Sequence, residues 1–191
     1  PGVAPTGNPV KLPLVVVMPD CGRGGWYSDW LRPTTDAGRQ MWASYHLDEL
    51  RRWIETGWPV RTDRRGRTIA GLSMGGFGAL SYAARRPDLF CFAASFSGAL
   101  DILDPLLGPF ADAMAEWNGG APGSIWGDPG RDVERWRAHN PVDLAERLAP
   151  HAVGDSAGDF AEHADRLLAR LQQETVTRTE RELVYRRLTE A

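Results

Sequence analysis

Residues 68–78 read Thr-Ile-Ala-Gly-Leu-Ser-Met-Gly-Gly-Phe-Gly, and this stretch decides the fold. Its first three residues suit a short β-strand, which runs directly into the pattern Gly-x-Ser-x-Gly. Residues 74–86 then have the composition of a helix. A strand that passes into a helix through so tight a turn needs small residues on both sides of the serine, and Gly71 and Gly75 supply them.

Two further segments are predicted to be strands buried on both faces. Residues 12–18 (Leu-Pro-Leu-Val-Val-Val-Met) and residues 90–96 are apolar without alternation, which is typical of parallel strands covered on both sides. Residues 40–56 carry aromatic and aliphatic side chains at helical spacing. The order strand, helix, strand, helix, strand predicts parallel strands joined by right-handed crossovers.

The rest of the chain adds no further strand. No strand-like apolar run follows residue 96, and the sequence changes character beyond residue 150. We therefore expect one α/β domain over residues 1–191, with a doubly wound, mostly parallel sheet, flanking helices and an incomplete set of strands. The remaining predicted segments are a loop insertion at about 98–130, short helices at 131–138 and 142–148, and a divergent helical tail at about 150–191.

Composition narrows the class of partner. The 191 residues are 42% hydrophobic and 25% charged, as in an ordinary globular domain. The formal net charge of −3 and the absence of basic runs argue against a nucleic-acid surface, so a small molecule is the expected partner. No apolar run approaches the ~20 residues of a membrane span. A cytoplasmic location is favoured, with a secreted or cell-envelope protein as the alternative.

The two cysteines, Cys21 and Cys91, show no metal-ligand spacing. Both lie on or beside predicted strands. We interpret them as small buried apolar residues and not as redox-active thiols or zinc ligands.

The tight turn at Ser73 predicts a nucleophile. It lifts Ser73 Oγ above the carboxyl ends of the strands, where ligands bind in open α/β sheets. It also aims the Met74 backbone N–H and the following helix N-terminus at the place where an oxyanion would form. A glycine-rich turn without chemistry is the alternative reading. The predicted strand before the turn and the helix after it favour the nucleophile.

A serine nucleophile needs a histidine to take its proton and an acid to orient that histidine. In this type of fold the acid and then the histidine follow the serine, which leaves His139, His151 and His163. His139 is predicted to lie in a turn, as a surface or turn-bonding residue. His163 falls within a predicted helix, whereas a base normally comes from a loop after a late strand.

Several motifs together resemble the esterase D and mycolyltransferase family of α/β-hydrolases. The resemblance covers residues of about 12–148. It implies hydrolysis of carboxylic esters through an acyl-serine intermediate, without a cofactor or a metal ion, or acyl transfer to a sugar or alcohol acceptor. The motifs are Val-Val-Val-Met-Pro-Asp at 15–20, Gly-Arg-Gly-Gly-Trp-Tyr-Ser-Asp-Trp at 22–30, Gly-Leu-Ser-Met-Gly-Gly-Phe-Gly-Ala-Leu at 71–80, Ile-Trp-Gly-Asp-Pro at 125–129 and His-Asn-Pro at 139–141.

The resemblance also implies an acid and exposes departures. Residues 174–178 open a predicted helix where the mycolyltransferases carry their catalytic glutamate, which favours Glu174, with Asp155 or Asp159 as alternatives. A solvated carboxylate near a helix N-terminus is the other reading of Glu174.

The family's histidine lies in a His-Ser-Trp-like segment that has no match here. The family also has a first strand and a His-Gly loop that supplies a second oxyanion N–H. Neither of these has a match here.

We therefore expect a chain truncated at both ends that hydrolyses activated esters poorly by itself. Loss of a single member of the nucleophile–base pair can cost about 10⁶-fold in kcat. A hydrolase-like fragment or binding module without catalysis is the alternative of another class.

The aromatic residues after the first strand are candidates for a substrate wall. Trp26 and Tyr27 follow the carboxyl end of a strand and are predicted to contact an acyl chain or acceptor beside Ser73. Trp30 and Trp126 are expected to fasten long loops to the sheet instead.

Overall fold

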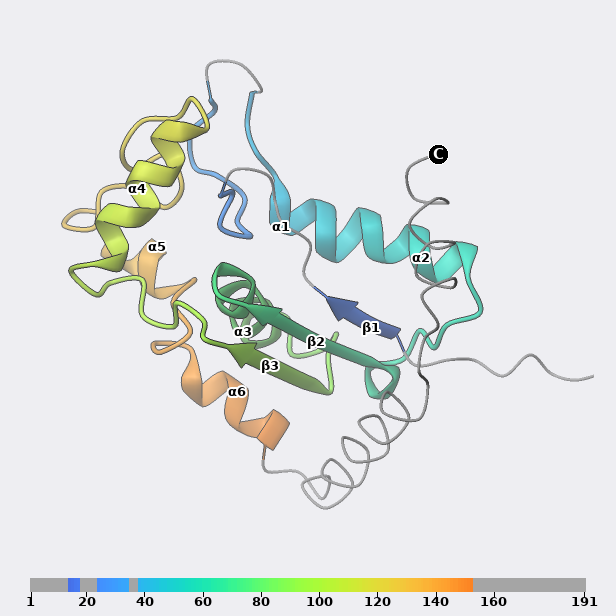
Figure 1. Ribbon diagram of the computed structural model, residues 1–191. Helices are drawn as coiled ribbons and strands as arrows, with labels where there is room; N and C mark the ends of the chain where they lie inside the picture. The colour runs from blue at the N-terminus through green and yellow to red at the C-terminus, as the bar shows by residue number, and fades with distance from the viewer. Residues whose placement is uncertain (1–13, 18–23, 35–37, 153–191) are drawn as a thin grey trace, which may run out of the picture. The chain divides into compact units, whose positions relative to one another are not determined.

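The computed structural model describes residues 14–17, 24–34 and 38–152 (Figure 1). Residues 1–151 and 152–191 form separate compact units, and the second lies almost wholly outside the described residues. Within the described ranges, no helix has the length and apolar character needed to cross a bilayer.

Three parallel strands form the sheet, in the order β1-β2-β3. The register pairs Val16 of β1 with Ile69 of β2, and Ile69 with Ala93 of β3. The parallel arrangement predicted from the sequence is confirmed. The strands are β1 (Leu14–Val17), β2 (Arg67–Leu72) and β3 (Phe92–Phe96).

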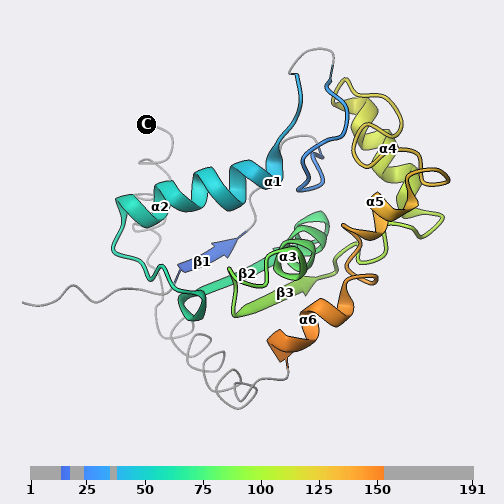
Figure 2. The ribbon, with the colours of Figure 1, turned by 180° about the vertical axis from the view of Figure 1, so that it is seen from behind.

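Helices connect the strands in the predicted order. Between β1 and β2 the chain forms an unbroken helix over residues 42–57, which includes one π-helical stretch. α3 joins β2 to β3 and packs against both (Figures 1 and 2). The helices of these connections are α1 (Trp42–Ser44), the π-helix η1 (Tyr45–Leu50), α2 (Arg51–Gly57), the 3-10 turn η2 (Arg64–Gly66) and α3 (Met74–Arg85).

The segment predicted as an irregular insertion at 98–130 contains a helix, α4 (Leu107–Trp117), so that expectation was wrong in part. Ala111 and Ala115 form the buried side of α4, at 1% and 0% exposure. Pro109 lies in the first turn, where a missing N–H costs no helical hydrogen bond. Two shorter helices follow near the predicted places, α5 (Val133–Arg137) and α6 (Ala145–Ala152).

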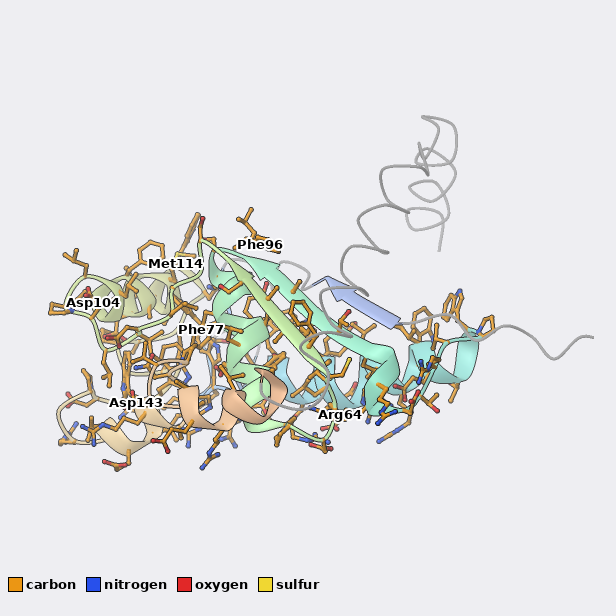
Figure 3. All side chains as sticks on the ribbon, turned by 90° about the horizontal axis from the view of Figure 1, so that it is seen from below. Arg64, Phe77, Phe96, Asp104, Met114 and Asp143 are labelled. Carbon is orange, nitrogen blue, oxygen red and sulfur yellow. The ribbon has the colours of Figure 1, made fainter. Side chains whose placement is uncertain are left out.

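β3 was predicted to be buried on both faces, but it is only half-buried, and Phe96 at its carboxyl end is 59% exposed. Within the described part of the chain β3 pairs with β2 alone, so no neighbouring strand covers its other edge. Figure 3 shows Phe96 at the end of the sheet opposite Arg64, the residue that opens η2. The carboxyl ends of the strands therefore carry exposed apolar surface.

Tryptophans from two loops form the centre of the core beside α3. The ring of Trp126 lies 5.7 Å from that of Phe77 on α3 and 5.0 Å from that of Trp136 on α5. Its indole N–H donates to Ser28 Oγ at 3.0 Å, and the indole N–H of Trp30 donates to the Gly25 carbonyl at 2.9 Å. Trp30 and Trp126 were predicted to fasten long loops to the sheet; they do fasten loops, but the contacts are with α3, with α5 and with other loop residues.

Truncation of Trp126 tests this core. Trp126→Ala is expected to lower the free energy of unfolding by about 3–5 kcal/mol, because it leaves a cavity among buried aromatic rings and removes the hydrogen bond that Ser28 Oγ accepts from the indole N–H. Trp117→Ala makes the same chemical change at a side chain that is 64% exposed, and should change stability by less than about 0.5 kcal/mol. Urea unfolding measures both. Equal effects would contradict the assignment of Trp126 to the core.

Candidate active site

Ser73 occupies a strained turn between β2 and α3. Its backbone has φ 55° and ψ −122°, a conformation that non-glycine residues rarely adopt, and it caps the N-terminus of α3. The Ser73 N–H donates to the Phe96 carbonyl at 2.8 Å, while the N–H groups of Gly76 and Phe77 donate to the Ser73 carbonyl at 2.9 and 3.2 Å. The side chain is exposed. These bonds hold an accessible hydroxyl at the carboxyl edge of the sheet.

The turn depends on glycine because backbones touch there. A Cβ at Gly71 would overlap the carbonyl group of Gly75, and a Cβ at Gly76 would overlap Ser95 Oγ and approach the Gly98 Cα to 2.9 Å. The requirement for glycine at position 71 is confirmed. The close approach at Gly76 and Gly98 extends the contact from the strand to the loop that follows β3.

The Met74 backbone N–H is available for an oxyanion. It is the first N–H of α3, and it donates no hydrogen bond to any other residue in the described ranges. Orphan N–H groups at a helix N-terminus attract negative charge, and the helix dipole acts in the same direction. The Met74 side chain packs against the core, which fixes this first turn.

The described histidine side chains are held in the core. His46 Nδ1 lies 3.2 Å from the Tyr82 hydroxyl, and burial lowers the pKa of His46 to about 4. His139 Nδ1 donates to the Arg135 carbonyl at 2.8 Å, and burial, with the nearby Arg85 charge, lowers the pKa of His139 to about 4. No hydrogen bond joins either one to Ser73.

His139 was predicted as a surface or turn-bonding residue. The turn bond is confirmed, but the surface location is wrong, because His139 is only 8% exposed and packs beside Trp126. The side chain of His151 and the whole of His163, Glu174, Asp155 and Asp159 lie outside the described residues.

Trp26 and Tyr27 were predicted to wall the substrate site, and the structure corrects this. They are 1% and 3% exposed. The Trp26 ring lies 5.4 Å from that of Phe77, and the Tyr27 ring packs over Gly78, where a Cβ would overlap it. Large rings gain more from burial against α3 than from exposure at a loop surface, so both belong to the core.

Exposed apolar side chains lie instead at the elbow, the strand-to-helix turn formed by residues 71–75. Leu72, directly before Ser73, is 69% exposed, and Phe96, whose carbonyl bonds Ser73, is 59% exposed. The sequence did not single them out, because Leu72 was only the variable position of the Gly-x-Ser-x-Gly turn and Phe96 the last residue of a strand predicted to be buried. Their position as the last residues of β2 and β3 was the available signal.

No cluster of three or more His, Cys, Asp or Glu side chains that could bind a metal occurs among the residues that the structure describes. Cys91 is a half-buried free thiol whose pKa burial raises, in line with a small apolar role. Cys21 lies outside the described residues.

Comparisons with known proteins bear on the family and the fold of the chain. The model of the Esterase family, described as "Putative esterase", matches residues 8–190. Esterase Rv1288 of Mycobacterium tuberculosis is 36% identical over 136 residues, which cover 69% of this chain and 29% of the relative. Diacylglycerol acyltransferase/mycolyltransferase Ag85B of Mycobacterium leprae is 33% identical over 141 residues, covering 71% of this chain and 41% of the relative. The chain therefore spans less than half the length of these curated relatives.

A solved structure supports the fold assignment. MPT51 (FbpC1) of Mycobacterium tuberculosis superposes with a TM-score of 0.55 at 29% sequence identity, covering 66% of this chain and 45% of that one. The fold is that of the α/β-hydrolases, with parallel strands and flanking helices, as the sequence predicted.

A methyl group at the elbow tests the close backbone contact. Gly71→Ala should lower the free energy of unfolding by about 2 kcal/mol or more, because its Cβ has no room beside the Gly75 carbonyl. Gly57→Ala is the matched control, since a Cβ at Gly57 meets nothing within 4 Å, and should be neutral or slightly stabilising. Thermal or urea unfolding reports both changes. A Gly71→Ala variant as stable as Gly57→Ala would refute the contact.

Proposed function

This chain belongs to the Esterase family, and on that premise we propose that the protein cleaves carboxylic esters with Ser73 as the nucleophile. The observation that carries the proposal is the backbone of Ser73, held at φ 55° between β2 and α3 with its side chain exposed. A costly conformation at an accessible serine is typical of a functional constraint. The relative named Esterase Rv1288 supports the ester substrate class.

In the proposed reaction Ser73 Oγ attacks the carbonyl carbon of the ester and gives its proton to a base. The carbonyl electrons move to the oxygen, which accepts a hydrogen bond from the Met74 N–H. The bond to the alcohol oxygen then breaks, and the alcohol leaves with the proton returned by the base. Water attacks the acyl-serine in the same way, releasing the acid and restoring Ser73.

We assign the base to neither described histidine, since His46 and His139 are both buried and hydrogen-bonded elsewhere. Glu174 is proposed as the acid that orients the base. Its support is the family resemblance of residues 174–178, the segment that opens the last predicted helix.

Acyl transfer is the second candidate, because another relative is named diacylglycerol acyltransferase/mycolyltransferase. The first half of the reaction would be the same, and an acceptor hydroxyl would replace water in the second half. Product partition separates the two functions. With an activated ester and an added sugar, hydrolysis predicts free acid whatever the sugar concentration, whereas acyl transfer predicts a sugar ester whose share rises with it.

Replacement of the nucleophile tests the main proposal. The intact protein should react with a serine-directed phosphonate at Ser73, and Ser73→Ala should abolish labelling and lower hydrolysis of a p-nitrophenyl ester by about 10⁴- to 10⁶-fold. Ser97→Ala is the matched control, since Ser97 is also exposed, has φ 50° and follows a neighbouring strand. It should keep labelling and activity.

Mass spectrometry of the labelled peptide and initial rates are the two readouts. Intact protein that takes up no phosphonate, or Ser73→Ala that is labelled like the control, would contradict the proposal. The first of these results would favour a hydrolase-like binding module without catalysis.

A further inference from the structure

Two tryptophan rings lie in contact on the surface at the end of α2. The ring centroids of Trp53 and Trp58 are 4.7 Å apart, and the ring planes meet at 63°. Trp53 is 61% exposed and Trp58 is 50% exposed. Large aromatic rings gain free energy when they are buried, so two exposed rings side by side form an apolar patch that needs a physical reason.

The pair lies apart from the elbow. Trp53 belongs to α2, and Trp58 is the first residue after that helix. The chain then runs through η2 into the amino end of β2, whereas Ser73 follows the carboxyl end of the same strand (Figures 1 and 2). A ligand on these two rings therefore does not contact the reacting groups of the esterase proposal.

The backbone holds both rings in place. Trp53 is fixed by its position within α2. The Trp58 N–H donates to the Ile54 carbonyl at 3.0 Å, and the Val60 N–H donates to the Trp58 carbonyl at 2.8 Å. A surface that is ordered before binding loses little conformational entropy when a ligand arrives.

The angle between the rings limits the shape of the ligand. With their centroids 4.7 Å apart the rings touch each other, so no proline ring or other flat group fits between them. Because the planes meet at 63°, the outward faces of the two rings cannot both lie against one flat ligand. They suit two successive rings of a chain that curves.

Polar groups beside the rings indicate the chemistry of the ligand. Neither indole N–H of Trp53 and Trp58 donates a hydrogen bond within the described part of the chain, so both can donate to a ligand oxygen. Glu49, four residues before Trp53, and its neighbour Arg52 are exposed, and they add an acceptor and a donor. A tetraalkylammonium ion could lie on the ring faces, but it has no atom that accepts these hydrogen bonds.

We propose that Trp53 and Trp58 form a binding platform for a curved oligosaccharide of gluco-configured pyranose rings. Such rings carry most of their hydroxyl groups around the edge and present C–H groups on their faces. The hydrogens of these C–H groups carry a partial positive charge, which the negative face of an indole attracts. The hydroxyl groups at the edge can donate to Glu49 and accept from Arg52. The platform binds the glycan without reacting with it and is independent of the esterase proposal.

Calorimetric titration of the intact protein with maltohexaose, whose α-linked rings form a curved chain, tests the platform. Cellohexaose is the matched flat ligand, since the same rings are joined by β-links. Maltohexaose should bind saturably, and cellohexaose should bind at least about threefold more weakly. Trp53→Ala and Trp58→Ala should each lower the affinity for maltohexaose at least about tenfold, because each change removes one stacking face.

Two control variants locate the site. Trp117→Ala removes a tryptophan of similar exposure, 64%, from α4, and it should bind maltohexaose like the parent protein. Ser73→Ala should also keep the full affinity, because the elbow lies at the other end of β2. Trp53→Phe keeps an aromatic face and should lose less affinity than Trp58→Ala. If Trp53→Ala does not fold, these last two variants decide the matter.

The proposal is overturned if neither hexasaccharide binds saturably at millimolar concentrations, or if Trp58→Ala binds as tightly as Trp117→Ala. A loss of affinity in Ser73→Ala would place the glycan at the elbow instead. Tighter binding of cellohexaose than of maltohexaose would refute the curved ligand. Binding of a decaproline peptide or of phosphatidylcholine vesicles, with no binding of either hexasaccharide, would refute the glycan and assign the surface to a peptide or a membrane.

Discussion

Close contact between backbones at the end of β2 is the constraint on which the rest of the structure depends. Gly71 and the Gly75 carbonyl leave no room for a side chain, and the loop after β3 also approaches α3 at Gly76 and Gly98, where a Cβ on either residue would lie 2.9–3.0 Å from the backbone of the other. The chain turns from strand to helix within one residue, so Ser73 takes a left-handed conformation. That conformation exposes its hydroxyl while its N–H is tied to β3. The close backbone contact thus accounts for the strand-to-helix turn, the strained backbone of Ser73 and the exposure of its side chain.

The aromatic core supports this turn by holding α3 in place. Phe77, one turn into α3, contacts Trp26 and Trp126 from two separate loops, and Trp126 also contacts Trp136 of α5. The loops are joined further by the N–H groups of Leu31 and Arg32, which donate to carbonyls of residues 125 and 124 at 3.0 Å. A helix anchored on this side cannot rotate to relax the elbow, so the strained serine persists.

The sequence predicted the elements whose patterns are local and missed features that depend on packing between distant segments. Continuous apolar runs and the Gly-x-Ser-x-Gly turn were enough for β1, β2, α3 and β3. The helix α4 was not predicted because its sequence contains Gly108 and Pro109. A proline in the first turn of a helix nevertheless removes no helical hydrogen bond. The spacing of Trp26 and Tyr27 is equally compatible with a substrate pocket and with the core. Only their contact with α3 shows that they belong to the core.

The central claim is that the strained turn presents a serine that becomes acylated. Rapid quenching of the intact protein with a p-nitrophenyl ester, followed by peptide mass spectrometry, tests it most directly. The account predicts that the mass of the acyl group appears on the peptide that contains Ser73, and that it decays as the acid is released. Ester turnover with acyl mass on another residue, or with none on Ser73 at any quench time, would contradict it.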